Sequence, residues 1–316
     1  IKMVHTGEFF VDLNIEDDME LIKVLEELKV IKDEEKGIIM MPKKVPMKFG
    51  YRTSLYIFVD FIKLLGRANI VQNDIEEILE KINIVVKTIL NRNFELILNR
   101  IDYRYDVAIV SEKARKIILE KLLSKCKEKA SYMRKLERYK SNVKYFAKSK
   151  SNIIYDKEFV RIIKGEEIQE YEKDIIRFEA QVKCGHLRYK SKIENNPVER
   201  ELREYLTWEK YKEYMDKMII KIVGKGDFYN LYHATKIINK STLPDKNKLE
   251  LVEFLKFTSQ KRSLSKTYEK YGRYKYNKYI KILEDLNINP IVIPEKEKIT
   301  YIPNPLRGLI DSFINN

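Results

Sequence analysis

The sequence has 316 residues, of which 44% are hydrophobic and 35% are charged. A chain of this length and composition can bury a core, which excludes a disordered protein and favours two folded domains. No apolar run approaches the roughly 20 residues of a membrane-spanning helix, and the first residues lack the apolar region of a secretory signal. The two cysteines, Cys126 and Cys184, have no metal-ligand spacing. We therefore expect reduced thiols in a cytoplasmic protein that does not bind membranes.

The net charge is the first indication of a partner. There are 62 Lys and Arg residues against 48 Asp and Glu, which gives a formal charge of +14 and a pI near 9.3. A polyanion such as nucleic acid binds a surface of this kind by releasing counterions. An AT-rich coding sequence also enriches lysine without any ligand, so the distribution of the charge along the chain must decide.

The first 110 residues mix strand and helix patterns. Short apolar runs at 8–13 and 54–60 predict strands. Between 74 and 90, apolar residues recur at helical spacing behind a cap at Asn73 and Asp74, which predicts an amphipathic helix. Residues 94–110 alternate charged and apolar side chains, which indicates a strand with one polar face.

The next segment is basic and leads to a break. Ser111 is expected to cap a long helix that runs to about Lys140, and residues 111–150 contain fourteen Lys and Arg against four Glu. Residues 153–157 and 175–183 predict strands, with a turn or short helix at 165–171 between them. The run Asn195-Asn196-Pro197 then favours a new helix, so we place a domain boundary between 195 and 196.

The remainder of the chain is predicted to be mostly helical. Helices are expected at 198–223 and 246–260, with an interruption at Gly224–Gly226. Residues 263–271, Gly272 and 273–286 have the outline of a helix-turn-helix, and 290–316, with four prolines, is expected to form an extended tail. The fold class is therefore α+β, with a mainly antiparallel sheet domain at 1–195 followed by an α-helical domain at 196–316.

Basic and aromatic residues are concentrated in the predicted helix-turn-helix. Residues 256–281 include nine Lys and Arg and a single acidic residue. On the helix 273–286 we expect Tyr276, Tyr279, Ile280, Leu283 and Leu286 to form a buried stripe, with the basic side chains toward solvent. Such a helix could enter the major groove of DNA, although a solvated basic face is the simpler alternative. The candidate DNA contacts are Lys266, Lys270, Arg273, Tyr274, Lys275 and Lys278.

Three strings of charged residues lie on predicted strands: LNRIDYRYD (98–106), KSNIIYDKE (150–158) and DIIRFEAQVK (174–183). The two-residue period of a strand places Asp102 and Asp106 on one face, and Glu179 on one face with Arg177. Carboxylates on the inner face of a sheet require a cation or a basic partner. The pattern therefore indicates either a metal site or structural ion pairs, and the two remain open here.

The order of these strings resembles the gene II replication initiators of filamentous phages and, more distantly, the initiators of staphylococcal rolling-circle plasmids. In those families an Arg–apolar–Asp strand, a strand ending in tyrosine before a basic residue, and an Arg–apolar–Glu strand follow one another. Residues 54–70 and 263–293 also look like the phage proteins. The His-apolar-His metal motif of many other nicking enzymes is missing, because His5, His186 and His233 are scattered.

The resemblance implies a nicking enzyme in which Tyr155 attacks a DNA phosphodiester. The products would be a 5′-phosphotyrosine and a free 3′-OH that a polymerase can extend. A phenol has a pKa of about 10 and needs activation, and the phosphodiester is shielded by its own charge. Lys157, Arg177 and Arg100 would supply positive charge to the site and the DNA. Asp156, directly after the tyrosine, departs from relatives with an uncharged residue there.

The resemblance also implies a divalent metal and several partners. Asp102 and Glu179 would hold Mg²⁺ or Mn²⁺, with Asp106 as a further candidate ligand. The expected partners are double-stranded origin DNA, single-stranded DNA at the nick, and a host helicase and polymerase. Two alternatives remain: a sequence-specific DNA-binding protein that does not cleave, or a relaxase of a mobile element with the same chemistry. Without the resemblance, Tyr155 is most simply a tyrosine packed on a sheet.

Overall fold

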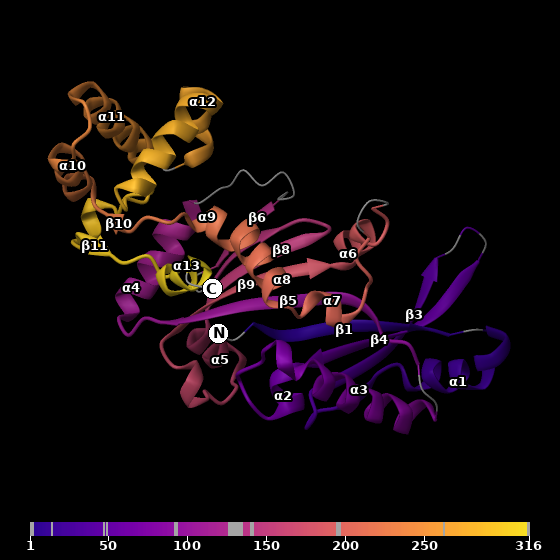
Figure 1. Cartoon of the computed structure of the whole chain (residues 1–316). Helices are drawn as coiled ribbons and strands as arrows, with labels where there is room; N and C mark the ends of the chain where they lie inside the picture. The colour runs from indigo at the N-terminus through magenta and orange to yellow at the C-terminus, as the bar shows by residue number, and fades with distance from the viewer. Residues whose placement is uncertain are drawn as a thin grey trace. The chain divides into compact units, whose positions relative to one another are not determined.

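The computed structural model describes residues 3–13, 15–46, 48, 50–91, 94–125, 135–139, 142–193, 197–261 and 263–314. Side chains are described for these residues except 15–18, 28, 90, 125 and 135–139. The chain combines a large antiparallel sheet with many helices and a helical C-terminal region (Figure 1). The predicted α+β class is therefore confirmed.

Within the described residues, nine strands form one sheet in the order β2-β3-β4-β1-β5-β9-β8-β7-β6. Their bounds are β1 Val4–Asp12, β2 Ile31–Asp33, β3 Ile38–Pro46, β4 Tyr51–Asp60, β5 Ile97–Ala108, β6 Lys135–Tyr139, β7 Asn142–Phe146, β8 Lys150–Asp156 and β9 Ile175–Lys183. Strand β1 pairs antiparallel with β4 and with β5, and β3 pairs antiparallel with β4. Each strand predicted from the sequence is present.

Helices connect these strands and follow them in the chain, and they make up most of the C-terminal region. Their bounds are α1 Ile15–Leu28, α2 Phe61–Leu65, α3 Ile75–Leu90, α4 Glu112–Lys116, α5 Lys157–Lys164, α6 Cys184–Lys190, α7 Leu202–Tyr205, α8 Trp208–Met215, α9 Lys221–Val223, α10 Leu231–Lys240, α11 Asp245–Lys261, α12 Leu264–Asp285 and α13 Arg307–Ile314. Two short strands, β10 Phe228–Tyr229 and β11 Tyr301–Ile302, pair with each other. The helices predicted at 74–90 and 246–260 correspond to α3 and α11.

Two predictions of secondary structure are wrong in part. Ser111 does cap a helix, because its side chain accepts a hydrogen bond from the Ala114 backbone N–H, and helical structure is described as far as residue 125. Residues 135–139 form β6, which pairs with β7, because their backbone groups find partners in a neighbouring strand. The expected extended tail contains the helix α13, which is anchored by the buried side chain of Leu309.

The chain divides into two compact units, each built from three segments. Unit 1 consists of Ile1–Tyr105, Lys148–Ser151 and Ala180–Tyr214, and unit 2 of Asp106–Ala147, Asn152–Glu179 and Met215–Asn316. Strands β5, β8 and β9 contribute residues to both units. The boundary predicted between residues 195 and 196 would separate two consecutive domains, whereas these units are interleaved along the chain. Both residues lie outside the described part of the chain, and the boundary stays a prediction.

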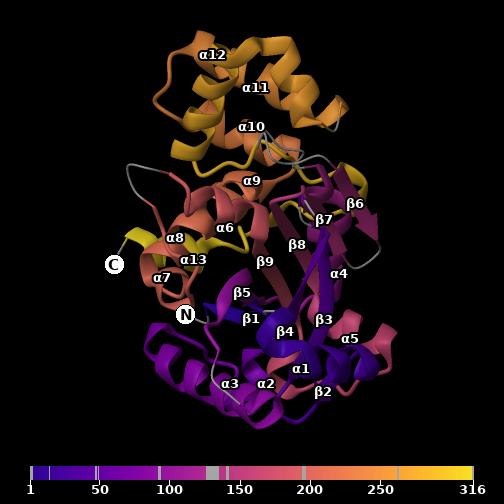
Figure 2. The same cartoon turned by 90° about the vertical axis from the view of Figure 1, so that its right-hand side faces the viewer.

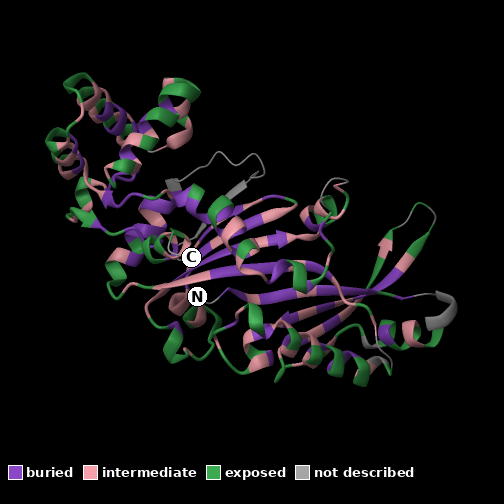
Figure 3. Ribbon diagram, in the orientation of Figure 1, coloured by how far each residue is buried: buried purple, intermediate pink, exposed green. Residues whose placement is uncertain are grey.

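Helices α2, α3, α7 and α8 bury one side of the sheet in unit 1. The Phe61 ring of α2 packs directly on Gly7 of β1, where an added Cβ would lie 2.6 Å from a ring carbon, so only glycine fits. Tyr103 of β5 is fully buried, donates a 2.6 Å hydrogen bond to the Tyr205 carbonyl and stacks on Tyr214. Figure 3 shows this pattern, with buried residues along the central strands and exposed residues on outer helix faces.

His186 in α6 makes the stability of unit 1 sensitive to pH. Its Nε2 atom lies 3.0 Å from the Tyr214 hydroxyl, and burial lowers its pKa from 6.5 to about 4. Such a histidine contributes stability that is complete above pH 6.5 and is lost as the pH falls toward 4. Because the ring is partly exposed, we expect a loss of about 1–2 kcal/mol.

A His186→Leu variant tests this expectation. Urea denaturation at pH 7, 5 and 4 should give a smaller decrease in unfolding free energy for the variant than for the parent chain. The comparison removes the contribution of other titrating groups, which both chains share. Identical pH dependence in the two chains would show that His186 does not titrate as described.

In unit 2, α10, α11 and α12 gather into a helical cluster (Figure 2). Phe254 of α11 is at its centre and makes edge-to-face contacts with Tyr271, Tyr276 and Tyr279 of α12. The predicted break at Gly272 is confirmed, since its φ of 70° and ψ of 166° interrupt the helical dihedrals of α12. A side chain at this backbone conformation would be strained, which explains the glycine.

Candidate active site

Tyr155 and Glu179 meet on one face of the sheet in unit 2. The Tyr155 hydroxyl donates a 2.6 Å hydrogen bond to Oε1 of Glu179. Ile154 and Asp156, the neighbours of the tyrosine in β8, are buried, whereas Tyr155 itself is partly exposed. Alternation along the strand thus places the tyrosine on the opposite face from Ile154 and Asp156, where its hydroxyl reaches the buried Glu179 and is itself shielded from water. The expected proximity of this tyrosine to a carboxylate is present in the structure.

Arg177 lies two residues before Glu179 and shares its face of β9. Its guanidinium binds Asp106 of β5 through two hydrogen bonds, 2.7 Å from Nε to Oδ1 and 3.0 Å from the second nitrogen to Oδ2. Arg177 and Glu179 are only 2% and 3% exposed. The arginine therefore neutralises one buried carboxylate directly and brings positive charge close to a second.

The electrostatics of this cluster keep the phenol protonated at rest. Burial, and after it the negative charge of Glu179, raises the pKa of Tyr155 well above 10, while Arg177 opposes the change. Burial first, and the negative charge of Glu179 second, therefore oppose a nucleophilic phenolate. The glutamate can lower its own share of this effect by taking the proton, and a cation can do so by binding the carboxylate.

Asp156 and Lys157 follow the tyrosine in the sequence and have different roles. Asp156 caps α5, because its side chain accepts a hydrogen bond from the Phe159 backbone N–H, and it also binds Arg115 at 2.8 Å. This accounts for the acidic residue beside the tyrosine. An Asp directly before a helix is a common N-cap, and the sequence analysis missed this signal. The ammonium group of Lys157 lies 3.1 Å from Glu172, and burial followed by Arg177 lowers its pKa.

Asp102 lies in unit 1 and has its own polar surroundings. Its Oδ2 accepts hydrogen bonds from the Thr6 hydroxyl at 2.5 Å and from Gln181 at 3.4 Å. Its Oδ1 lies 3.1 Å from Nε of Arg100, and burial raises the pKa of the carboxyl group. The predicted meeting of Asp102 with Tyr155 and Glu179 joins residues of the two units and stays a prediction.

The carboxylates of Asp102, Asp106 and Glu179 differ in how well they fit a divalent metal. Among the residues that the structure describes, there is no group of three or more His, Cys, Asp and Glu side chains arranged to hold one. Carboxylate oxygens are nevertheless the ligands that Mg²⁺ and Mn²⁺ prefer. Both oxygens of Asp106 are held by Arg177, and the Oδ1 of Asp102 is ion-paired with Arg100. Binding of a divalent metal by Asp102 and Glu179 stays a prediction, and Asp106 is the poorer candidate ligand.

The candidate DNA contacts of α12 face solvent, as predicted. Tyr276, Tyr279 and Leu283 are buried in the stripe expected from the sequence, and Ile280 and Leu286 are partly buried beside it. Of the five tyrosines between 268 and 279, Tyr274 is 83% exposed. The aromatic character of this surface therefore rests mainly on that one residue. The exposed basic residues are Lys266, Lys270, Arg273, Lys275 and Lys278.

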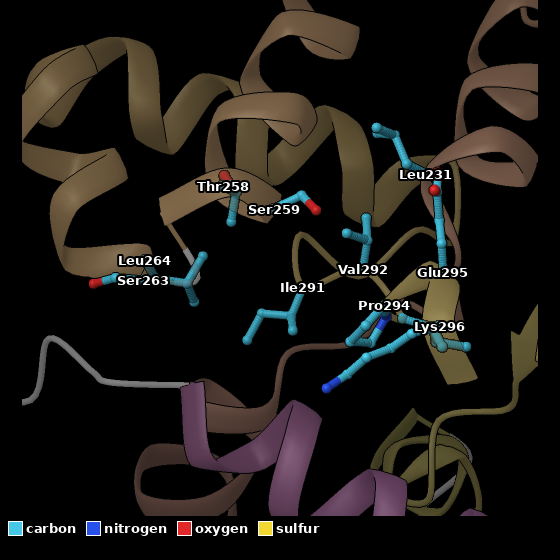
Figure 4. Close-up of a pocket in the computed structure, with 11 residues that line it drawn as sticks. Leu231, Thr258, Ser259, Ser263, Leu264, Ile291, Val292, Pro294, Glu295 and Lys296 are labelled. Atoms are coloured by element: carbon cyan, nitrogen blue, oxygen red, sulfur yellow. The ribbon is translucent and has the colours of Figure 1, made fainter. Parts of the chain in front are cut away.

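A pocket of about 340 Å³ lies beside the start of α12 (Figure 4). Its walls come from the end of α11, the first residues of α12 and the segment 291–296. Thr258, Ser259 and Ser263 provide hydroxyl groups, and Lys296 provides an ammonium group. Ser263 caps α12 by accepting a hydrogen bond from the Lys266 N–H, and Thr258 bonds to Thr267, so the hydroxyl groups of these two residues serve the helices themselves.

Comparison with known proteins adds no identity. A scan against protein-family models gave no match, and no curated protein matches the sequence. In the described part of the chain, no helix is both long enough and apolar enough to cross a membrane.

Proposed function

We propose that this protein nicks DNA by attack of Tyr155 on a backbone phosphodiester, as a rolling-circle replication initiator would. The observation that carries the proposal is the 2.6 Å hydrogen bond from the Tyr155 hydroxyl to Glu179. A nucleophile within hydrogen-bond reach of a base, with a cationic residue beside the base, is the arrangement that covalent catalysis requires. Arg177 supplies that charge from the same strand as Glu179.

The proposed step balances in atoms and charge. The Tyr155 oxygen forms a bond to phosphorus while its proton passes to Glu179. The bond from phosphorus to the 3′-oxygen breaks, and Lys157 donates a proton to the leaving oxygen. The lowered pKa of Lys157 makes it a stronger acid than an ordinary lysine, which suits this role. The products are a 5′-phosphotyrosine and a free 3′-OH.

A divalent cation fits this chemistry. Bound near Glu179, Mg²⁺ or Mn²⁺ would shield the phosphate charge and lower the pKa of the tyrosine. Asp102 is the second ligand that the resemblance implies. Arg177 holds Asp106 and so keeps a positive charge at the site whether or not the metal is bound.

Covalent capture of DNA tests the proposal. Single-stranded oligonucleotides of the cognate replicon, labelled at the 3′ end, are incubated with the chain and Mn²⁺ and analysed under denaturing conditions. We expect a labelled protein adduct that EDTA prevents, and peptide mapping should find the DNA on the peptide that contains Tyr155. Binding of the same oligonucleotides without an adduct would instead support the non-cleaving DNA-binding alternative.

The basic face of α12 is proposed to bind duplex DNA near the nick. A variant with Arg273→Gln, Lys275→Gln and Lys278→Gln should bind origin duplex at least about tenfold more weakly at low salt. The slope of log K against log[salt] should decrease by about 0.9 for each lost phosphate contact. Fluorescence anisotropy over a range of salt concentrations measures both quantities.

A control variant removes the same charge elsewhere in the helical cluster. It replaces three exposed lysines of α10 and α11 with glutamine: Lys236, Lys240 and Lys246. We expect its duplex affinity to stay within about threefold of the parent chain. Equal weakening in both variants would mean that net charge, rather than the α12 face, determines binding.

A further inference from the structure

Two aromatic rings of β4 face the same side of the sheet in unit 1. Tyr56 and Phe58 are separated by one residue, so the period of the strand directs both rings to one face. Both are partly exposed, whereas Leu55, Ile57 and Val59 between and beside them are fully buried. The register places Phe10 of β1 opposite Tyr56, and their rings stack at 6.0 Å. Two rings with accessible surface therefore lie side by side on a rigid strand.

A basic side chain lies over each of these two rings. The ammonium group of Lys43 lies 4.2 Å from the centre of the Tyr56 ring, and the guanidinium of Arg100 lies 5.5 Å from that of Phe58. Lys43 is exposed, and the side chain of Arg100 is 26% exposed. A phosphate can draw such a cation toward itself, and the ring or the guanidinium plane then remains to stack on a base.

We infer that Tyr56 and Phe58, with Lys43 and Arg100, form a binding platform for single-stranded DNA. The inference rests on the proposed function and names the surface of unit 1 that would hold the substrate strand. The aromatic rings on β4 can stack only on the flat faces of bases. A DNA duplex buries these faces in its base stack, whereas single-stranded DNA exposes them. Arg100 lies within reach of Glu8 and Asp102, and these carboxylates balance its charge, so it contributes mainly the flat face of its guanidinium. The preference for single strands thus comes from stacking, and the charge that raises the affinity comes from Lys43.

Leucine variants test the platform without chemistry. The full chain is titrated into fluorescein-labelled (dT)20 in EDTA, and the dissociation constant is measured by anisotropy. Tyr56→Leu and Phe58→Leu should each raise the constant about fivefold or more, as loss of one base stack predicts. The matched control is Tyr51→Leu, on the same strand but with the opposite alternation, which should change the constant less than twofold. An unchanged constant in both platform variants, or equal weakening toward a duplex hairpin, would overturn the inference.

A lysine pair gives a second measurement that does not disturb the rings. Lys43→Met should lower the affinity for (dT)20 and reduce its salt slope by about 0.7, the value for one phosphate of a single strand. Lys44→Met is the control, because Lys44 faces the other way and pairs with Glu26 of α1. Adduct formation by platform variants with unchanged (dT)20 affinity would refute the platform and leave nicking intact. Loss of (dT)20 affinity in a chain that never forms an adduct would refute nicking and leave the platform intact.

Discussion

A Tyr155→Phe chain is expected to lose covalent attachment to DNA by at least about a thousandfold, because no other group replaces the attacking oxygen. The substitution removes one hydroxyl and its hydrogen bond to Glu179, so it should lower the unfolding free energy by only about 1 kcal/mol. Binding of single-stranded DNA should stay within about twofold. The loss is therefore one of chemistry, and denaturing gels with 3′-labelled DNA measure it.

Tyr189→Phe is the control for this experiment. Tyr189 lies in α6 and is 64% exposed, so its hydroxyl is available to solvent but has no glutamate described beside it. It should form adducts at the rate of the parent chain. An adduct that survives in Tyr155→Phe would assign the nucleophile to another of the 21 tyrosines, and the proposed site would then be wrong.

An Arg177→Met chain is expected to lose about 3–5 kcal/mol of unfolding free energy. The guanidinium forms two hydrogen bonds with Asp106, and both side chains are buried. Removing the arginine leaves the Asp106 carboxylate in the interior without that guanidinium, and the cost of such a charge is large. Chemical denaturation at pH 7 measures the change as a shift in the urea midpoint.

Two further variants show whether burial is the cause. The double variant Arg177→Met, Asp106→Leu removes both charges and should recover most of the loss, since apolar pairs often replace buried ion pairs without cost. Arg203→Met breaks an exposed ion pair with Glu76 and should cost less than about 1 kcal/mol. A small effect at Arg177, similar to that at Arg203, would contradict the description of a buried, structurally important pair.

The strands that build the site follow from the sequence because their pattern is local. Residues 97–108 and 175–183 alternate polar and apolar side chains, which predicts strands, although the fold buries both sets at 101–104 and 176–180. The same alternation places Glu179 with Arg177. The break in α12 at Gly272 and the buried stripe that follows it are also local properties, since each depends on residues within a few turns of helix.

The partners across the sheet do not follow from local pattern. Nothing within β9 indicates that Arg177 binds Asp106, 71 residues away, or that Glu179 accepts a hydrogen bond from the Tyr155 hydroxyl. These contacts depend on which strands are neighbours and in which register, and both are set by tertiary packing. The error at β6 has a similar origin, because the basic residues after Ser111 favour a helix locally, while pairing with β7 favours a strand.

The interleaved course of the backbone has a consequence for engineering this protein. A chain ending at residue 195 would lack α7 and α8, and with them Tyr205, Tyr211 and Tyr214 that enclose Tyr103. Large aromatic surface would then meet water, so such a fragment should aggregate rather than serve as a minimal nuclease. To change the DNA target of this protein, the exposed residues of α12 should be replaced. Truncating the chain, or exchanging the segments before and after residue 195, would disrupt the fold.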